Sequence, residues 1–359
     1  MTISPSPAAK LIADLEARRP AALARAISIV ENQRQGFDAL LGALHPKIGR
    51  GRRIGITGPP GAGKSTVTTQ LAAQYRAAGL TVGIIAVDPT SPFTGGALLG
   101  DRIRMESVAL DPGVYIRSLA TRGSLGGLSS ATRAVADVLD AYGFDRILME
   151  TVGVGQSELD IARAADTTVV ILVPESGDSI QTLKAGLMEI ADIFVVNKAD
   201  RPGADRVRTD IELMLGMRAG EALRNVPAHH GVDLKKIMNP ARIAREASAG
   251  EQTESWTPPV LRTVAAKAEG IAELITALDR HLRYLEASGE LRRRRRQRLR
   301  EQVIDVTEHR IRQRLWRDPD TNAFIDSTLW AMESGAATPF TVADEVLSRS
   351  VDLLTRTRS

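Results

Sequence analysis

The chain has 359 residues, of which 43% are hydrophobic and 25% charged, and its formal net charge is +4. This length allows one large core with a smaller appended unit, and the mild charge does not by itself indicate a nucleic-acid partner. The lack of cysteine excludes disulfides, thiolate zinc sites and thiol nucleophiles, and no apolar run reaches the ~20 residues of a membrane span. We expect a soluble, cytoplasmic protein with no membrane partner.

The first part of the chain is predicted to be helical. Residues 8 to about 45 carry apolar side chains at helical spacing, and Pro20 divides this stretch into at least two helices. We assign residues 1–50 to an N-terminal helical extension.

Short apolar runs, mostly β-branched, then alternate with longer helical segments. The runs are Arg53–Thr57, Val82–Val87, Ile147–Met149, Thr168–Val173, Ile193–Val196 and the weaker Val260–Val264. This alternation predicts an α/β fold with a doubly wound, mostly parallel sheet flanked by helices, over residues 51–285. After Ala287 the strand pattern stops, and we expect residues 286–359 to form a C-terminal helical arm.

The stretch GPPGAGKS, from Gly58 to Ser65, matches G-x-x-x-x-G-K-[ST] at every fixed position. It follows the first predicted strand and opens a helical stretch, which is the context that a phosphate-binding loop requires. Backbone N–H groups and the helix N-terminus would surround a phosphate. Lys64 would reach the β- and γ-phosphate oxygens, and the Ser65 hydroxyl would bind Mg²⁺.

Carboxylates follow two further strands on the same edge of the predicted sheet. Asp88 ends VGIIAVD and Glu150 ends RILME, and a carboxylate there can hold Mg²⁺ directly or through water. Asp101, in LLGDRIRM, is a third candidate if the loop after Asp88 folds back. Gly153, in ETVGVGQ, could contact a γ-phosphate through its N–H group. Gln156 is too weakly indicated to be assigned as the group that positions water.

The strand IFVV is followed by NKAD, residues 197–200, a tetrapeptide that discriminates guanine. The Asp200 carboxylate would accept from two guanine N–H groups, which adenine does not offer. Asn197 would tie the loop and contact the purine, and the stem of Lys198 would lie on the base. Downstream, the backbone at Ala265 and Ala266 could close over guanine, although a plain strand–turn–helix explains these residues equally well.

Six segments in this order and spacing resemble the MeaB/ArgK/MMAA family of P-loop GTPases: GPPGAGKST, VDPTSP, GDRIRM, IRSLATRG, METVGVGQSE and VNKAD. In that class a glutamate, here Glu150, replaces the usual aspartate of the D-x-x-G motif. The resemblance implies GTP or GDP and Mg²⁺ as ligands. It also implies a chaperone of an adenosylcobalamin-dependent acyl-CoA mutase, chiefly methylmalonyl-CoA mutase. Such a chaperone gates cofactor loading and protects or reactivates the mutase.

The family's site residues are carried over onto matching positions. Asp88, Asp101 and Glu150 match the acids near magnesium, residues 174–184 resemble a switch that couples to the mutase, and Lys184 matches its catalytic lysine. The C-terminal arm resembles a homodimerisation arm. The phosphate loop comprises Gly58, Pro59, Pro60, Gly61, Ala62, Gly63, Lys64, Ser65 and Thr66.

The sequence gives weaker support to three other functions. A metal-insertion GTPase needs soft ligands, but there is no cysteine and the five histidines are scattered. A kinase of transport proteins, a label this family once carried, would need adenine binding, which NKAD opposes. The run Arg292–Arg296 lacks the interleaved aromatic residues of a nucleic-acid binder, which leaves a solvated helix face or the rim of an interface.

Overall fold

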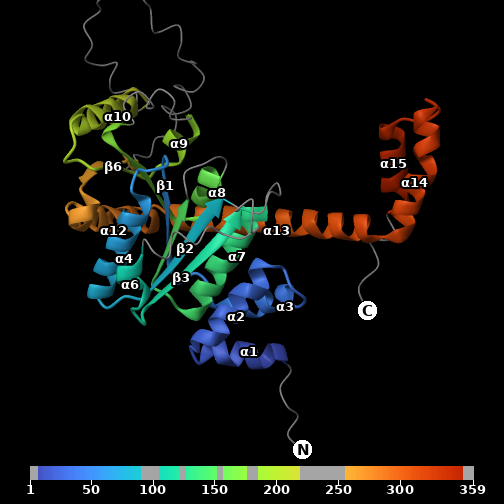
Figure 1. The fold of residues 1–359 in the computed structure, drawn as a ribbon, viewed down its shortest axis with the longest axis horizontal. Coiled ribbons are helices and arrows are strands. Elements are labelled where there is room, and N and C mark those ends of the chain that lie inside the picture. Colours follow the sequence, from blue (N-terminus) through green and yellow to red (C-terminus); the bar gives the residue numbers. More distant parts are fainter. Residues whose placement is uncertain are drawn as a thin grey trace, which may run out of the picture. The chain divides into compact units, whose positions relative to one another are not determined.

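The computed structural model describes residues 7–89, 105–121, 127–151, 157–175, 185–218 and 255–350. Within them lies a seven-stranded sheet of order β3-β2-β4-β1-β5-β6-β7, in which every neighbouring pair of strands is parallel. Helices cover both faces of this sheet (Figure 1). The expected doubly wound α/β fold is therefore confirmed.

Six of the strands coincide with the predicted runs. They are β1 (Arg52–Thr57), β2 (Val82–Pro89), β4 (Arg146–Thr151), β5 (Thr167–Leu172), β6 (Ile193–Asn197) and β7 (Val260–Thr263). The strand β3 (Val114–Thr121) was not predicted; it pairs only with β2 at the edge of the sheet. An edge strand is less buried, so β3 tolerates Arg117 and Ser118 and lacks a continuous apolar run.

The two faces of the sheet bury separate cores. One face packs against α4 (Lys64–Ala77), α6 (Glu106–Ala109) and α12 (Ile271–Ala287). The other face has two clusters of buried side chains. One lies under α7 (Gly127–Tyr142) and α8 (Ser157–Ala164), and the other under α9 (Ala185–Ile190) and α10 (Ala204–Arg218).

The N-terminal helices extend the core that contains α7. They are α1 (Pro7–Glu16), α2 (Pro20–Glu31) and α3 (Phe37–Leu44), followed by the short η1 (His45–Lys47). Pro20 occupies the first turn of α2, where a missing N–H costs nothing, so it begins the second helix as predicted. The buried side chains of α2, among them Leu23 and Ile27, join the α7 core.

The chain divides into two compact units, residues 1–295 and 296–359. The division falls within α13 (Glu290–Arg317), and the second unit also contains α14 (Pro319–Glu333) and α15 (Pro339–Arg349). The predicted domain boundaries after residues 50 and 285 are not tested by this division and stay predictions. In the described part of the chain, no helix combines the length and apolar character that crossing a membrane requires.

The amino edge of the sheet is fastened by buried ion pairs. Arg53 of β1 donates to Asp137 Oδ1 at 2.7 Å and to Asp140 Oδ2 at 3.0 Å. Asp140 also accepts the backbone N–H groups of residues 49–51. Burial opposes the charge of Arg53, but these aspartates and Asp166 raise the pKa of its guanidinium and keep it protonated.

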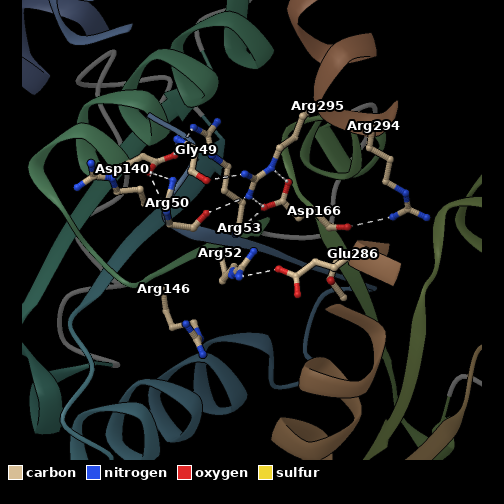
Figure 2. Close-up of polar contacts among 12 residues, drawn as sticks. Gly49, Arg50, Arg52, Arg53, Asp140, Arg146, Asp166, Glu286, Arg294 and Arg295 are labelled. Carbon is tan, nitrogen blue, oxygen red and sulfur yellow. Dashed lines mark hydrogen bonds and ion pairs between the residues drawn. The ribbon is translucent and has the colours of Figure 1, made fainter. Parts of the chain in front are cut away.

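Two consecutive arginines near the start of α13, Arg294 and Arg295, join the same edge (Figure 2). Arg295 forms a two-pronged pair with Asp166, at 2.9 and 3.2 Å, and also donates to Gly49 O. Arg294 forms a two-pronged pair with Asp192, with both distances 2.9 Å. Asp166 and Asp192 directly precede β5 and β6. Part of the Arg292–Arg296 run, whose role the sequence left open, therefore fastens α13 to the sheet.

Candidate nucleotide-binding site

The candidate site lies at the carboxyl edge of the sheet. After β1 the chain forms β2 and then β3 on one side, and β4 returns to fill the place between β2 and β1. The chain then crosses to the other side of β1 and forms β5, β6 and β7 in order. The order of the strands thus reverses beside β1, and ligands of such sheets bind at the carboxyl ends of the strands at this point. The phosphate-loop sequence begins directly after β1, and NKAD overlaps the end of β6.

The phosphate loop joins β1 to α4 through three glycines with positive φ, at residues 58, 61 and 63. At Gly58, whose φ is +139°, a Cβ would lie 2.0 Å from the carbonyl oxygen of Ile171 on β5. At Gly63 a Cβ would lie 2.3 Å from Asn197 Nδ2. Glycine is therefore required at two of the motif's fixed positions, because neighbouring strands approach the loop so closely. Pro60, Gly61 and Thr66 are exposed, whereas Ala62 is buried.

Lys64 begins α4 and its side chain folds back over the loop. Its Nζ donates to Gly58 O at 2.8 Å and to Pro59 O at 2.9 Å, and the residue is only 6% exposed. A buried ammonium needs such acceptors. These bonds hold the charge of Lys64 at the phosphate loop.

Glu150, near the end of β4, accepts hydrogen bonds from two hydroxyl groups of α4. Its Oε1 accepts from Ser65 Oγ at 3.0 Å and its Oε2 accepts from Thr68 Oγ1 at 2.6 Å, although the residue is only 3% exposed. The predicted neighbours Ser65 and Glu150 thus meet. A carboxylate beside a hydroxyl is the hard oxygen donor set that Mg²⁺ prefers, so these residues fit that ion. Among the residues that the structure describes, no group of three or more His, Asp or Glu side chains is placed to hold a metal ion.

Asp88 is the last residue but one of β2, on the same edge, one residue beyond the level of the β2–β4 ladder at which Val87 faces Thr151. Its backbone position agrees with the prediction, and its side chain lies outside the described part. Asp101, Gly153, Gln156 and Lys184 also lie outside the described residues, as does most of the predicted switch at residues 174–184. Their assignments stay predictions.

Asn197 connects three segments of the site. Its Nδ2 donates to Ala62 O of the phosphate loop at 2.8 Å, while its Oδ1 accepts from Thr263 Oγ1 at 3.0 Å and from Ala265 N at 3.1 Å. The side chain is buried, so all three bonds are shielded from water. The prediction that Asn197 ties the loop is confirmed, whereas its contact with a purine is not tested.

The remaining base-site residues surround this connection. Lys198 has a positive φ of +55°, which sharply turns the chain after β6. The Asp200 carboxylate is about half exposed and lies 3.8 Å from Lys267 Nζ, so it is open to a base. Ala265 and Ala266 begin the short helix η4 (Ala265–Lys267), and the first N–H groups of a helix lack partners within it. Ala265 N is taken by Asn197, which makes Ala266 the better donor to a base.

Two polar residues of the site were not predicted. Thr68 holds Glu150, and Thr263 orients Asn197. Thr68 lies one helical turn after Ser65, so the repeated hydroxyl in KSTVTTQ was a usable signal. No local pattern identifies Thr263, because it meets Asn197 only through the β6–β7 pairing.

Comparison with known proteins agrees with this geometry. The family model "Methylmalonyl Co-A mutase-associated GTPase MeaB" matches residues 23–320. The chain belongs to the MeaB family. A relative from Pyrococcus horikoshii, named as a GTPase, is 47% identical over 302 residues, which are 84% of this chain and 86% of the relative. This MeaB-family chain is therefore a P-loop GTPase.

Two further matches bear on its role. The mouse protein "Methylmalonic aciduria type A homolog, mitochondrial" is 32% identical over 295 residues, 82% of this chain and 64% of that protein. A crystal structure titled "LAO/AO transport system kinase" matches with a TM-score of 0.62 and 28% identity, and covers 97% of this chain and 99% of that one. The second match supports the fold of the MeaB-family chain along nearly its whole length.

Proposed function

We propose that this GTPase acts as a chaperone of an adenosylcobalamin-dependent acyl-CoA mutase of the methylmalonyl-CoA mutase type. In this role it gates cofactor loading and protects or reactivates the mutase. The observation that carries the proposal is the match of a mutase-associated family over residues 23–320. The mouse relative, whose name refers to methylmalonic aciduria, supports the same role.

In the proposed reaction, water attacks the γ-phosphate of GTP. Lys64 stabilises charge on the β- and γ-phosphate oxygens from its place above the loop. Ser65 and Glu150, with Asp88 and Asp101, would hold Mg²⁺, which would neutralise phosphate charge. Gly153 would contact the γ-phosphate, and Lys184 would act on the nucleotide when the mutase binds at residues 174–184.

The base site selects guanine in this proposal. Asp200 accepts from two guanine N–H groups, Lys198 covers one face of the base, and Ala266 N donates to its edge. Asn197 supports the selection of guanine indirectly, because it links the phosphate loop to Ala265 and so holds the base site in place. A nucleotide with the wrong base would leave the Asp200 carboxylate without its donors, which weakens binding.

Hydrolysis assays of the purified chain test the proposal. GTP and ATP are supplied in parallel, with and without a cobalamin-dependent acyl-CoA mutase from the same genome. We expect slow GTP hydrolysis that rises when the mutase is added, and no ATP hydrolysis. GTP hydrolysis that ignores every mutase offered would contradict the chaperone role and leave the GTPase activity standing.

A transport-system protein kinase is the second candidate, because the matched crystal structure carries that title. A kinase would transfer the γ-phosphoryl group to a protein instead of to water. Incubation with γ-labelled ATP and GTP separates the two, since only a kinase leaves label on protein. Metal insertion is less well supported, because a chain without cysteine lacks the soft ligands suited to a metal cargo.

We further propose a homodimer formed through the second unit. Many of its large apolar side chains are exposed, and its own core is small. Exposed large apolar side chains in such number are common at protein interfaces. The cytoplasmic location expected from the sequence stays a prediction, which cell fractionation checks.

A further inference from the structure

The backbone of Glu150, the acid of the candidate metal site, is held in the sheet on both sides. It pairs with Ile56 of β1 on one side and with Ala86 of β2 on the other. The glutamate side chain still has three torsions, and only some of their settings bring a carboxylate oxygen beside Ser65. The group that fixes these torsions therefore decides whether the carboxylate is ready to support metal binding.

The hydroxyl of Thr68 is placed to fix them. Thr68 lies one turn after Ser65 on α4, on the same side of the helix. Its Oγ1 is 2.6 Å from Glu150 Oε2, while Ser65 Oγ is 3.0 Å from Glu150 Oε1, so each hydroxyl holds a different oxygen of the carboxylate. Thr68 and Glu150 are 0% and 3% exposed, so water does not compete for the bond between them.

A threonine in a helix commonly donates to the carbonyl oxygen four residues earlier, and Thr68 has this option as well. Its Oγ1 lies 3.0 Å from Lys64 O. The hydroxyl has one proton, and a carboxylate is the stronger acceptor, in agreement with the shorter distance to Glu150. The neighbouring Thr69 shows the ordinary helical bond, from its Oγ1 to Ser65 O at 2.7 Å.

The orientation of Glu150 matters because a serine that binds Mg²⁺ keeps its proton. Such a hydroxyl binds the ion through an oxygen lone pair, so its O–H must point away from the ion to another acceptor. In the structure Ser65 donates to Glu150 Oε1, and its lone pairs can then face the ion. The bond from Thr68 keeps this acceptor in place, because it holds the other oxygen of the same carboxylate.

We propose that Thr68 is a positioning residue for Mg²⁺ binding, which holds the Glu150 carboxylate so that Ser65 presents its oxygen to the ion. This inference rests on the proposed Mg²⁺ site at Ser65 and Glu150. Thr68 acts through Glu150 and does not bind the ion itself, because its hydroxyl is directed to Oε2. It supplies a hydroxyl that the phosphate-loop motif, which ends at Ser65, does not contain.

Release of GDP at different Mg²⁺ concentrations tests the proposal. The probe is GDP with a fluorescent group on its ribose, and its release from the full-length chain should slow as Mg²⁺ is added. We expect Thr68→Val to need about fivefold more Mg²⁺ for half of this slowing, because one hydrogen bond that orients Glu150 is lost. In EDTA its release rate should equal that of the wild type, because valine has nearly the shape of threonine and the phosphate loop is unchanged.

Two further variants separate positioning from a general structural role. Thr68→Ser keeps the hydroxyl and should restore the wild-type Mg²⁺ requirement. Thr69→Val is the matched control and should leave that requirement unchanged, because it removes a bond to a backbone carbonyl of the same helix.

The possible failures are distinguishable. A Thr68→Val variant with the wild-type Mg²⁺ requirement would overturn the proposal. Release from Thr68→Val that is faster by the same factor in EDTA and in Mg²⁺ would also overturn it, because the damage would then be general. Failure of Thr68→Ser to restore the requirement would count equally against it. Release from the wild type that ignores Mg²⁺ would refute the proposed metal site and this role of Thr68 with it.

Discussion

Gly58 lies so close to β5 that the phosphate loop has no room for a side chain at this position. We expect Gly58→Ala to destabilise the nucleotide-free protein more than Gly61→Ala. Both residues have positive φ, which alone costs a substituted residue about 1–2 kcal/mol. Only at Gly58 would the new Cβ also lie 2.0 Å from the Ile171 carbonyl oxygen, since nothing lies within 4 Å of the corresponding position at Gly61. Urea unfolding measures the difference, and equal losses would contradict this account.

Glu150 is the acid on which the hydroxyl groups of α4 converge. We expect Glu150→Gln to reduce GTP hydrolysis about 100-fold and to raise the Mg²⁺ concentration required, because a buried negative charge is lost from the metal site. Glu273→Gln is the control, since Glu273 is an exposed carboxylate on α12. Initial rates at several Mg²⁺ concentrations decide the matter. An unchanged rate and metal requirement would remove Glu150 from the site.

The sequence predicts much of the site at this scale because the motifs are local. The eight consecutive residues Gly58–Ser65 identify the phosphate loop, and their immediate neighbours indicate the strand before it and the helix after it. Thr263 is different, because its bond to Asn197 exists only once β6 and β7 pair, 66 residues apart in the chain. Tertiary partners of this kind leave no periodic trace in the sequence.

At the scale of elements, the junction between α13 and the sheet depends on Arg294. Burial opposes ionisation of Asp192, but contacts with His281 and Arg294 hold its pKa below the ordinary value. The folded state therefore gains stability from the Asp192 carboxylate above its unfolded pKa of about 3.9, and loses it as the pH falls through the lower folded pKa.

We expect Arg294→Gln to cost about 2 kcal/mol at pH 7, less than for a fully buried pair because the arginine is one-third exposed. The difference from the wild type should shrink as the pH falls below the unfolded pKa of Asp192, because protonation of its carboxylate removes the ion pair in the wild type. Arg293→Gln is the matched control, because that side chain is 80% exposed and should change stability little. Denaturant unfolding between pH 3 and 7 measures both. A difference that is constant with pH would contradict the role of Asp192.

The elements also show where periodicity fails. Buried central strands such as β5 contain a continuous apolar run, and β5 was predicted within one residue, whereas the edge strand β3 carries polar side chains and was missed. The arginine run 292–296 reads as one uniform feature, yet Arg293 is in solvent while Arg294 and Arg295 bind buried carboxylates. Which residue of such a run faces the sheet depends on the phase of the helix, and that is set by packing.

At the scale of the whole molecule, the second unit exposes large apolar and aromatic side chains of the kind found at protein interfaces. Its core consists of a few side chains around Leu315 and Val346. Trp330 and Phe340 are 75% and 81% exposed, and further large apolar residues are 40–60% exposed, including Leu329, Leu347 and Trp316. Aromatic side chains are the usual anchors of protein interfaces. The helical arm was predictable from the sequence, but the exposure of these residues was not.

If a second copy covers these aromatic residues, the double variant Trp330→Ser, Phe340→Ser should weaken dimerisation about 100-fold or more, since each removes an anchor of the interface. Sedimentation velocity over a range of concentrations measures the change. Leu110→Ser is the control, because Leu110 is 92% exposed in the first unit and a general loss of surface hydrophobicity would act there as well. A wild-type chain that stays monomeric at micromolar concentration, or a double variant that dimerises as well as the wild type, would refute the proposed interface. GTP hydrolysis by the double variant without mutase should remain, because the residues that carry it belong to the first unit.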